Sequence, residues 1–453
     1  MSISFSGAIM FYCLNSASVC WRGARRLLFI ITALSGLFCA SLTFVAHAQD
    51  ASSVFENYQQ NLFVIESFDR ISNNKNSVGS GFTVGDGTFI ATNYHVVADA
   101  VMEPENYAVR AVGLADQAIE THVVAADPIH DLAVLRVTVS EDEDATYPES
   151  GLALAETKPM VGEELVALGN PFDVGISVVP GTYNGELKKH FRPLIHFTGA
   201  LNPGMSGGPT VNMNGEVIGI NVAGAGNSVG FLVPVDDLKV LLETVDETDA
   251  TPGDVRDHFA ETIRSHNNAL IDDLLAGDWS LETFGPIRIP KVIREYVNCR
   301  GSAKTEDEDR RWTRSISDCR VADRLYLRDR FDTGPLEMQF TLLESDYLNA
   351  TQFATVFSGE NFQPFNRGGK EHFTEFDCVE RWTVLPNLGE QRFKASYCVR
   401  AYLDFPELYD VLYVARGMPD GKTGLNVHYT LAGVGEDAAS RFHSRFLEAP
   451  EWN

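Results

Sequence analysis

Residues 204–209 are the part of the chain with the clearest chemical meaning, and they read Gly-Met-Ser-Gly-Gly-Pro. Glycines on both sides of Ser206 allow backbone angles that other residues avoid, so the peptide can turn tightly around the hydroxyl. In such a turn the amides of Gly204 and Ser206 can point at one spot, where the oxyanion of a tetrahedral intermediate would form. A serine hydroxyl is a weak nucleophile at neutral pH and needs a base with an orienting acid. The turn therefore predicts a histidine and a carboxylate elsewhere in the chain.

Both partners occur upstream of the serine. His95 lies in the run Ala-Thr-Asn-Tyr-His-Val-Val, and Asp131 immediately precedes the apolar run Leu-Ala-Val-Leu. A carboxylate at the start of a buried strand is held rigidly and is partly removed from water. Asp127 is the competing acid, but we interpret it as a turn cap because the apolar strand follows Asp131 directly. The order His95, Asp131, Ser206 is that of chymotrypsin-type enzymes and differs from the subtilisin and α/β-hydrolase orders.

Each of these residues also has a structural interpretation. A serine in a glycine-rich turn can be an ordinary turn residue, and a lone histidine is more often a packed core residue than a base. The three-part pattern favours catalysis. His130, His190 and His196 lack such a context, and we interpret them as surface or structural residues. Gly79-Ser80-Gly81 is not followed by the lysine-bearing helix of a phosphate loop, so we predict a β-turn there.

With these residues in place, the chain resembles an HtrA/DegP-type member of the trypsin-like serine peptidases. The motifs that carry the resemblance stand in family order, at residues 79–82, 92–97, 131–135, 168–172 and 202–209. They indicate a peptidase region over residues 55–245, which is under half of the chain.

The resemblance implies a fold and a reaction. The fold would be a chymotrypsin-like double β-barrel with the active site between the barrels. His95 would be the general base, Asp131 its orienting acid and Ser206 the nucleophile, with the Gly204 and Ser206 amides as the oxyanion hole. The reaction would be peptide-bond hydrolysis through an acyl-enzyme intermediate. The setting would be protein quality control in the bacterial envelope.

The resemblance also indicates where a substrate pocket should lie. We expect it to be lined by Ala200, Leu201, Asn221, Val222 and Ala223. Neither the segment around Ala200 and Leu201 nor the segment around residues 221–223 contains a carboxylate, so a basic residue before the scissile bond is not expected. A small or medium apolar residue fits better.

Two features depart from the family pattern. Met205 stands beside the nucleophile, where the family usually has asparagine. Because this position supplies no essential proton, we expect Met205 to change substrate fit more than chemistry. No PDZ domain with its carboxylate-binding Gly-Leu-Gly-type loop is recognisable after the peptidase region. The sequence therefore gives no support for peptide sensing or cage assembly, and a homo-oligomer such as a trimer stays open but unsupported.

The segments that must position these residues read as short strands. Apolar runs bounded by Gly, Asn, Asp or Pro occur at residues 61–66, 88–91, 132–135, 164–168, 217–222 and 229–233. Many short strands with regular turn signals predict an all-β barrel or sandwich. Residues 236–245 have helical periodicity, and we expect them to close this domain.

Four regions follow one another along the chain. Residues 1–48 have the basic start, apolar run and Ala-x-Ala end typical of a secretory signal peptide, with an uncleaved membrane anchor as the alternative. Residues 49–247 form the predicted peptidase domain, and residues 248–284 a linker with a helical segment. Residues 285–453 form a C-terminal region to which the sequence assigns no function. The signal predicts export, and the resemblance makes the periplasm the expected destination.

The C-terminal region contains an internal repeat. Cys299 and Cys319 are 20 residues apart, Cys378 and Cys398 have the same spacing, and Arg-Trp-Thr lies between each pair. Four cysteines allow three pairings, and the repeat favours the two local ones. We therefore predict a duplicated, β-rich (α+β) region with disulfides Cys299–Cys319 and Cys378–Cys398. We expect both tryptophans to lie in its core.

The overall composition restricts the partners. The chain has 453 residues, of which 44% are hydrophobic, enough for two or three globular domains. Its net charge of −26 argues against nucleic-acid binding and against an anionic membrane surface. We expect polypeptide substrates, no membrane association after signal cleavage, and no cofactor or metal. The alternative is a catalytically silent binding or scaffold protein on a peptidase fold, which would work through its C-terminal region.

Overall fold

The computed structural model describes residues 51–113, 117–138, 148–224, 228–245, 251–304, 311–321, 324–334, 336–359 and 369–453. The predicted signal peptide at residues 1–48 therefore lies outside the described part. Residues from Gln49 to Asn453 form one compact unit. No helix in the described part of the chain is long and apolar enough to cross a membrane.

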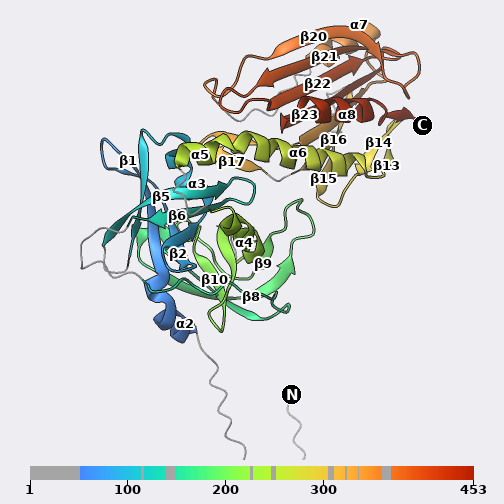
Figure 1. The fold of residues 1–453 in the computed structure, drawn as a ribbon. Coiled ribbons are helices and arrows are strands. Elements are labelled where there is room, and N and C mark those ends of the chain that lie inside the picture. The colour runs from blue at the N-terminus through green and yellow to red at the C-terminus, as the bar shows by residue number, and fades with distance from the viewer. Residues whose placement is uncertain are drawn as a thin grey trace, which may run out of the picture. The chain divides into compact units, whose positions relative to one another are not determined.

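Two closed six-stranded barrels form the first half of this unit, and they bear out the predicted double β-barrel (Figure 1). The first barrel contains β1 (Leu62–Asp69), β2 (Lys75–Val84), β3 (Phe89–Thr92), β4 (Tyr107–Val112), β5 (Ala118–Asp127) and β6 (Leu132–Val137). The second contains β7 (Glu164–Gly169), β8 (Ser177–Glu186), β9 (Ile195–Phe197), β10 (Pro209–Asn212), β11 (Val217–Gly224) and β12 (Gly230–Pro234). The helices of this half are α2 (Ala51–Tyr58), η1 (Gln59–Asn61), α3 (Tyr94–Met102), η2 (Pro171–Asp173) and α4 (Val235–Glu243).

One hydrophobic cluster is shared by the two barrels. Phe82 and Val134 from the first barrel pack in the same buried cluster as Leu168 and Ile220 from the second. Burying these side chains against each other removes apolar surface from water, which is the main favourable term in folding. This packing fixes the junction between the barrels, where the predicted catalytic residues lie.

The glycines at residues 79 and 81 do not form the predicted β-turn. They lie inside strand β2, and a Cβ atom on Gly79 would be 2.5 Å from a methyl group of Val96 and 3.0 Å from the carbonyl oxygen of Ser206. Glycine is required here because other backbone and side-chain atoms approach the strand closely. A glycine pair of this kind cannot be distinguished from a turn by sequence pattern alone.

Two helices connect the barrels to the C-terminal region. They are α5 (Pro252–Asp257) and α6 (Phe259–Leu275), and they occupy the segment predicted as linker and helix. Thr251 begins α5 with a capping box, because its hydroxyl accepts the amide of Asp254 and the Asp254 carboxylate accepts the amide of Thr251. The end of the predicted linker differs from expectation, since residues 280–284 form strand β13 (Ser280–Phe284).

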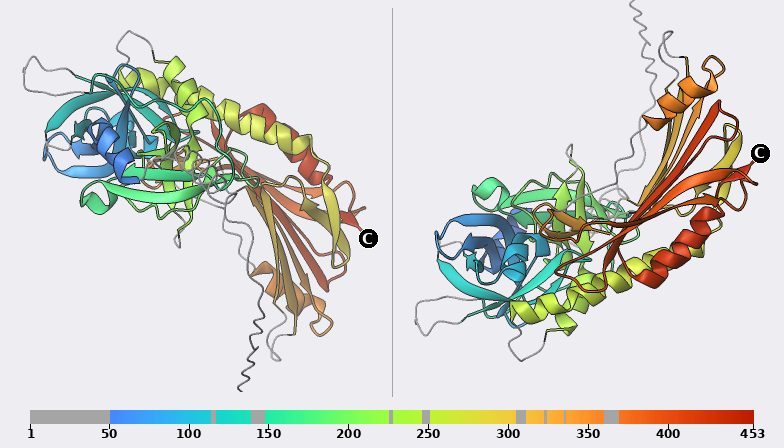
Figure 2. Two further views of the ribbon diagram at one scale, coloured as in Figure 1. Left: turned by 90° about the horizontal axis from the view of Figure 1, so that it is seen from below. Right: turned by 90° about the horizontal axis from the view of Figure 1, so that it is seen from above.

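A seven-stranded antiparallel sheet dominates the C-terminal region, in the order β15-β16-β19-β23-β22-β21-β20 (Figure 2). Its strands are β15 (Val297–Lys304), β16 (Thr313–Val321), β19 (Leu336–Glu344), β20 (Asp377–Val384), β21 (Arg392–Ala401), β22 (Tyr409–Gly417) and β23 (Thr423–Val434). The remaining elements are β13, β14 (Ile287–Val292), β17 (Leu325–Arg328), β18 (Phe331–Thr333), α7 (Ala350–Ser358), α8 (Glu436–Leu447) and β24 (Glu451–Trp452). Helices α6 and α8 cover one face of the sheet, where Leu270 and Phe442 pack with Phe340 and Tyr429.

The predicted disulfides are present, and they join neighbouring strands at the two ends of this sheet. Cys299–Cys319 links β15 to β16, and Cys378–Cys398 links β20 to β21. The expectation for the tryptophans holds only in part. Trp312 packs beside a small buried cluster, whereas Trp382 is 60% exposed because it lies on the edge strand β20.

The repeat in the sequence corresponds to the two halves of this sheet. The central strands β19 and β23 pair antiparallel, with Gln339 opposite His428. The halves differ in one connection. Between β21 and β23 the chain forms strand β22 in the sheet, whereas between β16 and β19 it forms the separate hairpin β17–β18. This hairpin leaves the sheet, and its contacts with the first barrel are described below.

Candidate active site

Asp131 and His95 lie in contact at the start of helix α3. Oδ2 of Asp131 is 2.6 Å from Nδ1 of His95, and Oδ1 accepts the His95 backbone amide at 2.8 Å. The Asp131 carbonyl accepts the backbone amide of Tyr94 and the side-chain amide of Asn93. The first amides of a helix have no partner within the helix, so Asp131 supplies partners for two of them. One residue therefore anchors both the helix and the imidazole ring.

The backbone of Asp131 has an unusual conformation. Its φ angle is 56°, in the left-handed region that aspartate tolerates better than most residues. The hydrogen bonds from Asn93, Tyr94 and His95 hold it there, and such strain persists only where the surroundings fix it. The buried strand β6 that follows begins at Leu132, where the sequence places it.

Two opposing effects set the electrostatics of His95, namely burial and the neighbouring Asp131. Partial burial lowers the pKa of His95, but the charge of Asp131 and its hydrogen bond to the ring outweigh this effect. The net result is a pKa raised above the ordinary value of 6.5. The Asp131 carboxylate also stabilises the imidazolium that would form when the ring accepts a proton.

Ser206 lies at the junction of the barrels, and its hydroxyl is turned toward strand β11. Oγ of Ser206 donates to the carbonyl of Val222 at 3.3 Å, and among the described residues this is the hydroxyl's only hydrogen bond. In this conformation the hydroxyl is therefore not hydrogen-bonded to His95, the predicted base. Catalytic hydrogen bonds are often loose without substrate, so this conformation does not rule out the pair.

The backbone amides around Ser206 differ in whether they have hydrogen-bond partners. The amides of Met205, Gly207 and Gly208 all donate to backbone carbonyls. The amides of Gly204 and Ser206 donate to none of the residues that the structure describes. Gly204 has a φ angle of 95°, and a Cβ atom there would be 2.3 Å from the carbonyl oxygen of Asn170. Only glycine fits this position, and the two free amides are those expected to form the oxyanion hole.

Ser80 supports this turn from the first barrel. Its hydroxyl donates to the Gly204 carbonyl at 2.7 Å and accepts the Asn170 amide at 2.8 Å, and its own amide donates to the Ser206 carbonyl at 2.7 Å. Sequence reasoning missed this role because Ser80 is 124 residues from Gly204. Its position between two buried glycines was the only available signal.

A pocket of about 250 Å³ opens beside Ser206. The described residues that line it are Leu201, Asn202, Pro203, Ser206, Asn221, Val222 and Gly224. Three of the predicted pocket residues are therefore in place, and Ala200 lies outside the lining. The side chain of Ala223 is not among those described. The described lining contains no carboxylate.

The buried side chain of Asn221 has a role different from the predicted substrate contact. Its amide nitrogen donates to the carbonyls of Leu168 and Met205, and its oxygen accepts from the hydroxyl of Thr210. These bonds hold the backbone under the nucleophile turn. The side chain therefore supports the site from behind.

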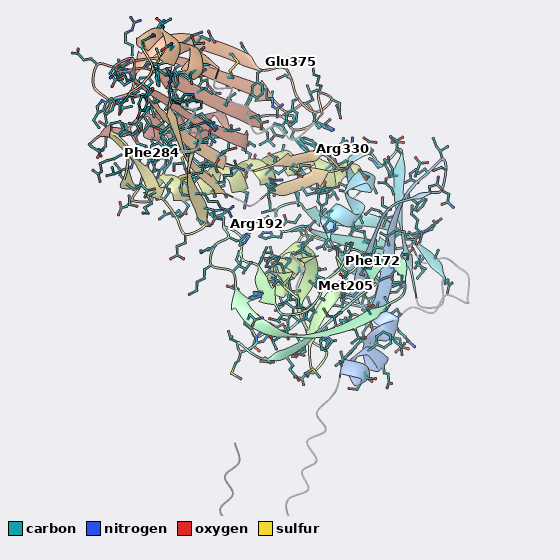
Figure 3. All side chains as sticks on the ribbon, turned by 180° about the vertical axis from the view of Figure 1, so that it is seen from behind. Phe172, Arg192, Met205, Phe284, Arg330 and Glu375 are labelled. Carbon is teal, nitrogen blue, oxygen red and sulfur yellow. A yellow bond between two sulfur atoms is a disulfide. The ribbon has the colours of Figure 1, made fainter. Side chains whose placement is uncertain are left out.

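Met205 is also not where the sequence suggested. Its side chain is fully buried in the core of the second barrel, with Leu165, Phe197 and Leu232 in the same cluster (Figure 3). Met205 is not among the described residues that line the pocket, so the structure shows no direct contact through which it would change substrate fit. Met205 anchors the turn by packing, and an apolar side chain suits a site where no polar partner is needed.

A second aspartate–histidine pair lies next to the first. Asp127 accepts the amides of Ile129 and His130, and its carboxylate is 2.6 Å from Nδ1 of His130. Asp127 thus caps the turn before Asp131. Burial is the largest single influence, and it raises the pKa of Asp127 and lowers that of His130. The hydrogen bonds and charges of the pair together outweigh burial, so the pKa of Asp127 is lowered and that of His130 is raised. The described residues contain no group of His, Cys, Asp or Glu side chains suited to holding a metal ion.

Comparisons with known proteins agree with this geometry. Residues 79–220 match the family described as "Trypsin-like peptidase domain". The chain is 36% identical over 170 residues to a "Probable periplasmic serine endoprotease DegP-like" from Pseudomonas putida (strain W619), which covers 35% of this chain and 33% of that protein. It is 33% identical over 172 residues to a protein of the same name from Chlamydia trachomatis, covering 34% and 31% respectively. The chain thus matches about a third of the length of these relatives.

A solved structure, the serine endoprotease from Yersinia pestis, shares 23% identity with a TM-score of 0.37, over 43% of this chain and 66% of that one. The family match and the relatives show that this chain contains a trypsin-like peptidase domain similar to those of HtrA/DegP-type proteins.

Proposed function

We propose that this chain, which carries a trypsin-like peptidase domain, is a serine endopeptidase that cleaves polypeptides through Ser206, His95 and Asp131. The observation that carries the proposal is the nucleophile turn. Of its five amides, those of 205, 207 and 208 donate to backbone carbonyls, while those of Gly204 and Ser206 donate to no residue in the described part of the chain. A turn that served packing alone would have no reason to leave this pair of donors without partners.

The reaction would begin with a rotation of the Ser206 hydroxyl from the Val222 carbonyl toward Nε2 of His95. Oγ then attacks the substrate carbonyl carbon while its proton moves to Nε2, and the oxyanion accepts the amides of Gly204 and Ser206. Collapse of the intermediate breaks the C–N bond, and the leaving amine takes the proton from His95. Water next attacks the acyl carbon and gives a proton to Nε2 of His95. The bond between this carbon and Oγ then breaks, and His95 returns the proton to Oγ, which releases the acid and restores the serine. Asp131 keeps the imidazole in the required tautomer throughout.

The pocket beside Ser206 indicates the substrate class. Leu201 and Val222 give it apolar walls, and its described lining offers no carboxylate for a lysine or arginine side chain. A pocket of about 250 Å³ suits a small or medium apolar residue before the scissile bond. A peptide library should show valine, alanine or leucine at this position, and a preference for arginine would contradict the assignment.

One observation favours a second candidate, a binding or scaffold protein on a peptidase fold. The Ser206 hydroxyl is hydrogen-bonded to Val222 and not to His95 in the described structure. If this rotamer were locked, the serine would stay inactive and the C-terminal region would be the working part. The two candidates differ in one property, the nucleophilicity of Ser206.

A fluorophosphonate probe tests that property, because it reacts with an activated serine and needs no knowledge of the substrate. We expect the full-length protein to be labelled at Ser206, and labelling to disappear in Ser206→Ala. Ser358→Ala, which changes an exposed serine at the end of helix α7, is the matched control and should label normally. Absence of labelling in the wild type between pH 6 and 9, with the protein folded, would favour the scaffold instead.

The names of the relatives and the predicted signal peptide support an exported, periplasmic protein. We propose that it acts in envelope quality control. A protease of this kind would cleave unfolded polypeptides in preference to folded ones. Digestion of a reduced, unfolded substrate and of its folded form should therefore differ in rate. Equal rates would argue for a dedicated substrate.

A further inference from the structure

The hairpin β17–β18 of the C-terminal region lies against the predicted base. The ring of Tyr326 on β17 meets the imidazole of His95 edge to face, with 6.2 Å between ring centroids and 82° between ring planes. This spacing and angle are those of a favourable aromatic pair. Tyr326 is thus the described side chain of the C-terminal region that touches the triad.

The same hairpin holds the helix that carries His95. The hydroxyl of Tyr94, the first residue of α3, donates to the carbonyl of Leu327 at 2.7 Å. The next hairpin residue, Arg328, forms ion pairs with Glu103, just past the end of α3, and at 3.8 Å with Asp99. The start and the end of α3 are therefore both tied to β17.

The β17–β18 hairpin packs against helix α3 on one side and against the C-terminal region on the other. Leu325, Leu327 and Phe331 of the hairpin belong to one buried cluster with Val97 and Val101 of α3. The far side of the hairpin is fixed to the C-terminal region. Phe331 stacks on the ring of His372 at 4.2 Å, and the Thr333 hydroxyl is 2.6 Å from the hydroxyl of Tyr402. Figure 3 labels Arg330, which lies in the turn of this hairpin.

The hairpin leaves the substrate pocket open. All described residues that line the pocket beside Ser206 come from residues 201–224, and none from the C-terminal region. An inhibitory segment would fill this pocket or cover Ser206. The hairpin instead contacts helix α3 and the ring of His95, as a support for the base would.

We propose that Tyr326 is a positioning residue for His95, and that the β17–β18 hairpin makes the C-terminal region a structural part of the active site. Tyr326 limits rotation of the imidazole, so that Nε2 stays in reach of Ser206 while Asp131 holds Nδ1. This inference rests on the proposed peptidase function. It also assigns a function to the β17–β18 hairpin, which is the connection that differs between the two halves of the repeat.

The test uses full-length protein with three substitutions. Tyr326→Ala removes the ring, Tyr326→Phe keeps it, and Tyr347→Ala changes a tyrosine that is 78% exposed and distant in the fold. We expect Tyr326→Ala to lower kcat on an apolar peptide substrate about three- to tenfold with KM unchanged, as loss of an aromatic pair implies. Tyr326→Phe should retain most of the rate, and Tyr347→Ala should match the wild type. A wild-type kcat in Tyr326→Ala, or an equal loss in Tyr326→Phe, would overturn the positioning role of the ring.

A second measurement does not depend on activity. Amide hydrogen exchange across residues 94–102 should become faster in Tyr326→Ala and in Tyr94→Phe, which removes the bond to Leu327 and preserves the ring of Tyr94. Unchanged exchange in both variants would overturn the support of α3 by the hairpin. If the wild type shows no probe labelling, the peptidase proposal fails, and exchange alone then decides whether the hairpin holds α3. If Tyr326→Ala does not fold, Tyr326→Leu removes the aromatic ring while keeping an apolar side chain against the cluster, and it supplies both measurements.

Discussion

The carboxylate of Asp131 connects catalysis to local folding. Its Oδ1 accepts the backbone amide of His95, the second residue of helix α3, and its Oδ2 is hydrogen-bonded to the ring nitrogen Nδ1 of the same residue. Removing the charge therefore changes the tautomer and pKa of His95 as well as the helix start. This double role explains why a residue in a strained left-handed conformation is held by so many contacts.

The pH dependence of activity follows from the environment of His95. The base must be neutral to accept the serine proton, and Asp131 raises its pKa above 6.5 despite partial burial. Activity should therefore be lost as the pH falls through this raised pKa, and kcat/KM plotted against pH should have a midpoint above 6.5. Asp131→Asn removes both raising causes, so the midpoint should move down while kcat falls by about 10⁴-fold. A wild-type midpoint below 6.5 would contradict the assignment of His95 and Asp131.

The buried position of Met205 predicts an effect on stability. Met205→Ala would leave a cavity in the second barrel and should lower the free energy of unfolding by about 2–5 kcal/mol. Met160→Ala is the control, because Met160 is 78% exposed, and it should change stability little. Urea unfolding measures both. If Met205→Ala changed the substrate preference and left the stability unchanged, Met205 would act on substrate fit and not on packing.

At the level of elements, strand β2 of the first barrel braces the nucleophile turn of the second. Ser80→Ala removes the hydroxyl that holds the Gly204 carbonyl and accepts the Asn170 amide. The turn should then orient its free amides poorly, and loss of one oxyanion donor is worth about 10²-fold in kcat. We expect Ser80→Ala to lose about 10-fold or more, because the amides remain present but less fixed. Ser77→Ala, further out on the same strand, should leave kcat unchanged, and equal rates in both variants would exclude the brace.

The sequence predicted elements best where chemistry and apolar runs are local. The strands around residues 132–137 and 217–224, the closing helix α4 and the disulfide pairs all lie where the patterns placed them. The sequence did not show the support that Ser80 and the Asn221 side chain give to the nucleophile turn, or the burial of Met205. Their roles depend on atoms far away in sequence, such as the Gly204 carbonyl and the core of the second barrel. Sequence spacing cannot show such contacts, and a polar or apolar side chain beside a catalytic motif has no fixed direction until the barrels close.

At the scale of the whole molecule, the peptidase domain and the C-terminal region share a core. The cluster around α3 contains Val255 and Phe259 from the connecting helices, and Phe373 and Phe405 from the C-terminal region. Separating the regions would expose these side chains to water, at a cost that grows with the apolar area. The sequence pattern changes near residue 247, where we predicted the domain boundary. The hydrophobic cluster around α3 nevertheless contains residues from both sides of this position.

A buried ion pair in the C-terminal region offers a test of this continuity. Arg400 binds Asp410 at 2.6 Å with both side chains buried, and Asp410 also accepts from Tyr402, which contacts Thr333 of the hairpin. Arg400→Met leaves the Asp410 carboxylate buried without its cation, which should cost about 3–5 kcal/mol. Burial, the largest influence, raises the pKa of Asp410 even with Arg400 present. The variant's carboxyl group should therefore be protonated at low pH, and its stability deficit should grow as the pH rises.

The hairpin should transmit this damage to the active site. Because Asp410, Tyr402 and Thr333 form one chain of hydrogen bonds, Arg400→Met should also slow fluorophosphonate labelling of Ser206, at temperatures where the protein remains folded. Arg330→Met is the matched control, since Arg330 is 90% exposed at the hairpin turn, and it should affect neither stability nor labelling. Melting curves at pH 5 and pH 8 and labelling rates measure the two effects. A destabilised Arg400→Met with wild-type labelling would show that the C-terminal region and the active site are mechanically independent.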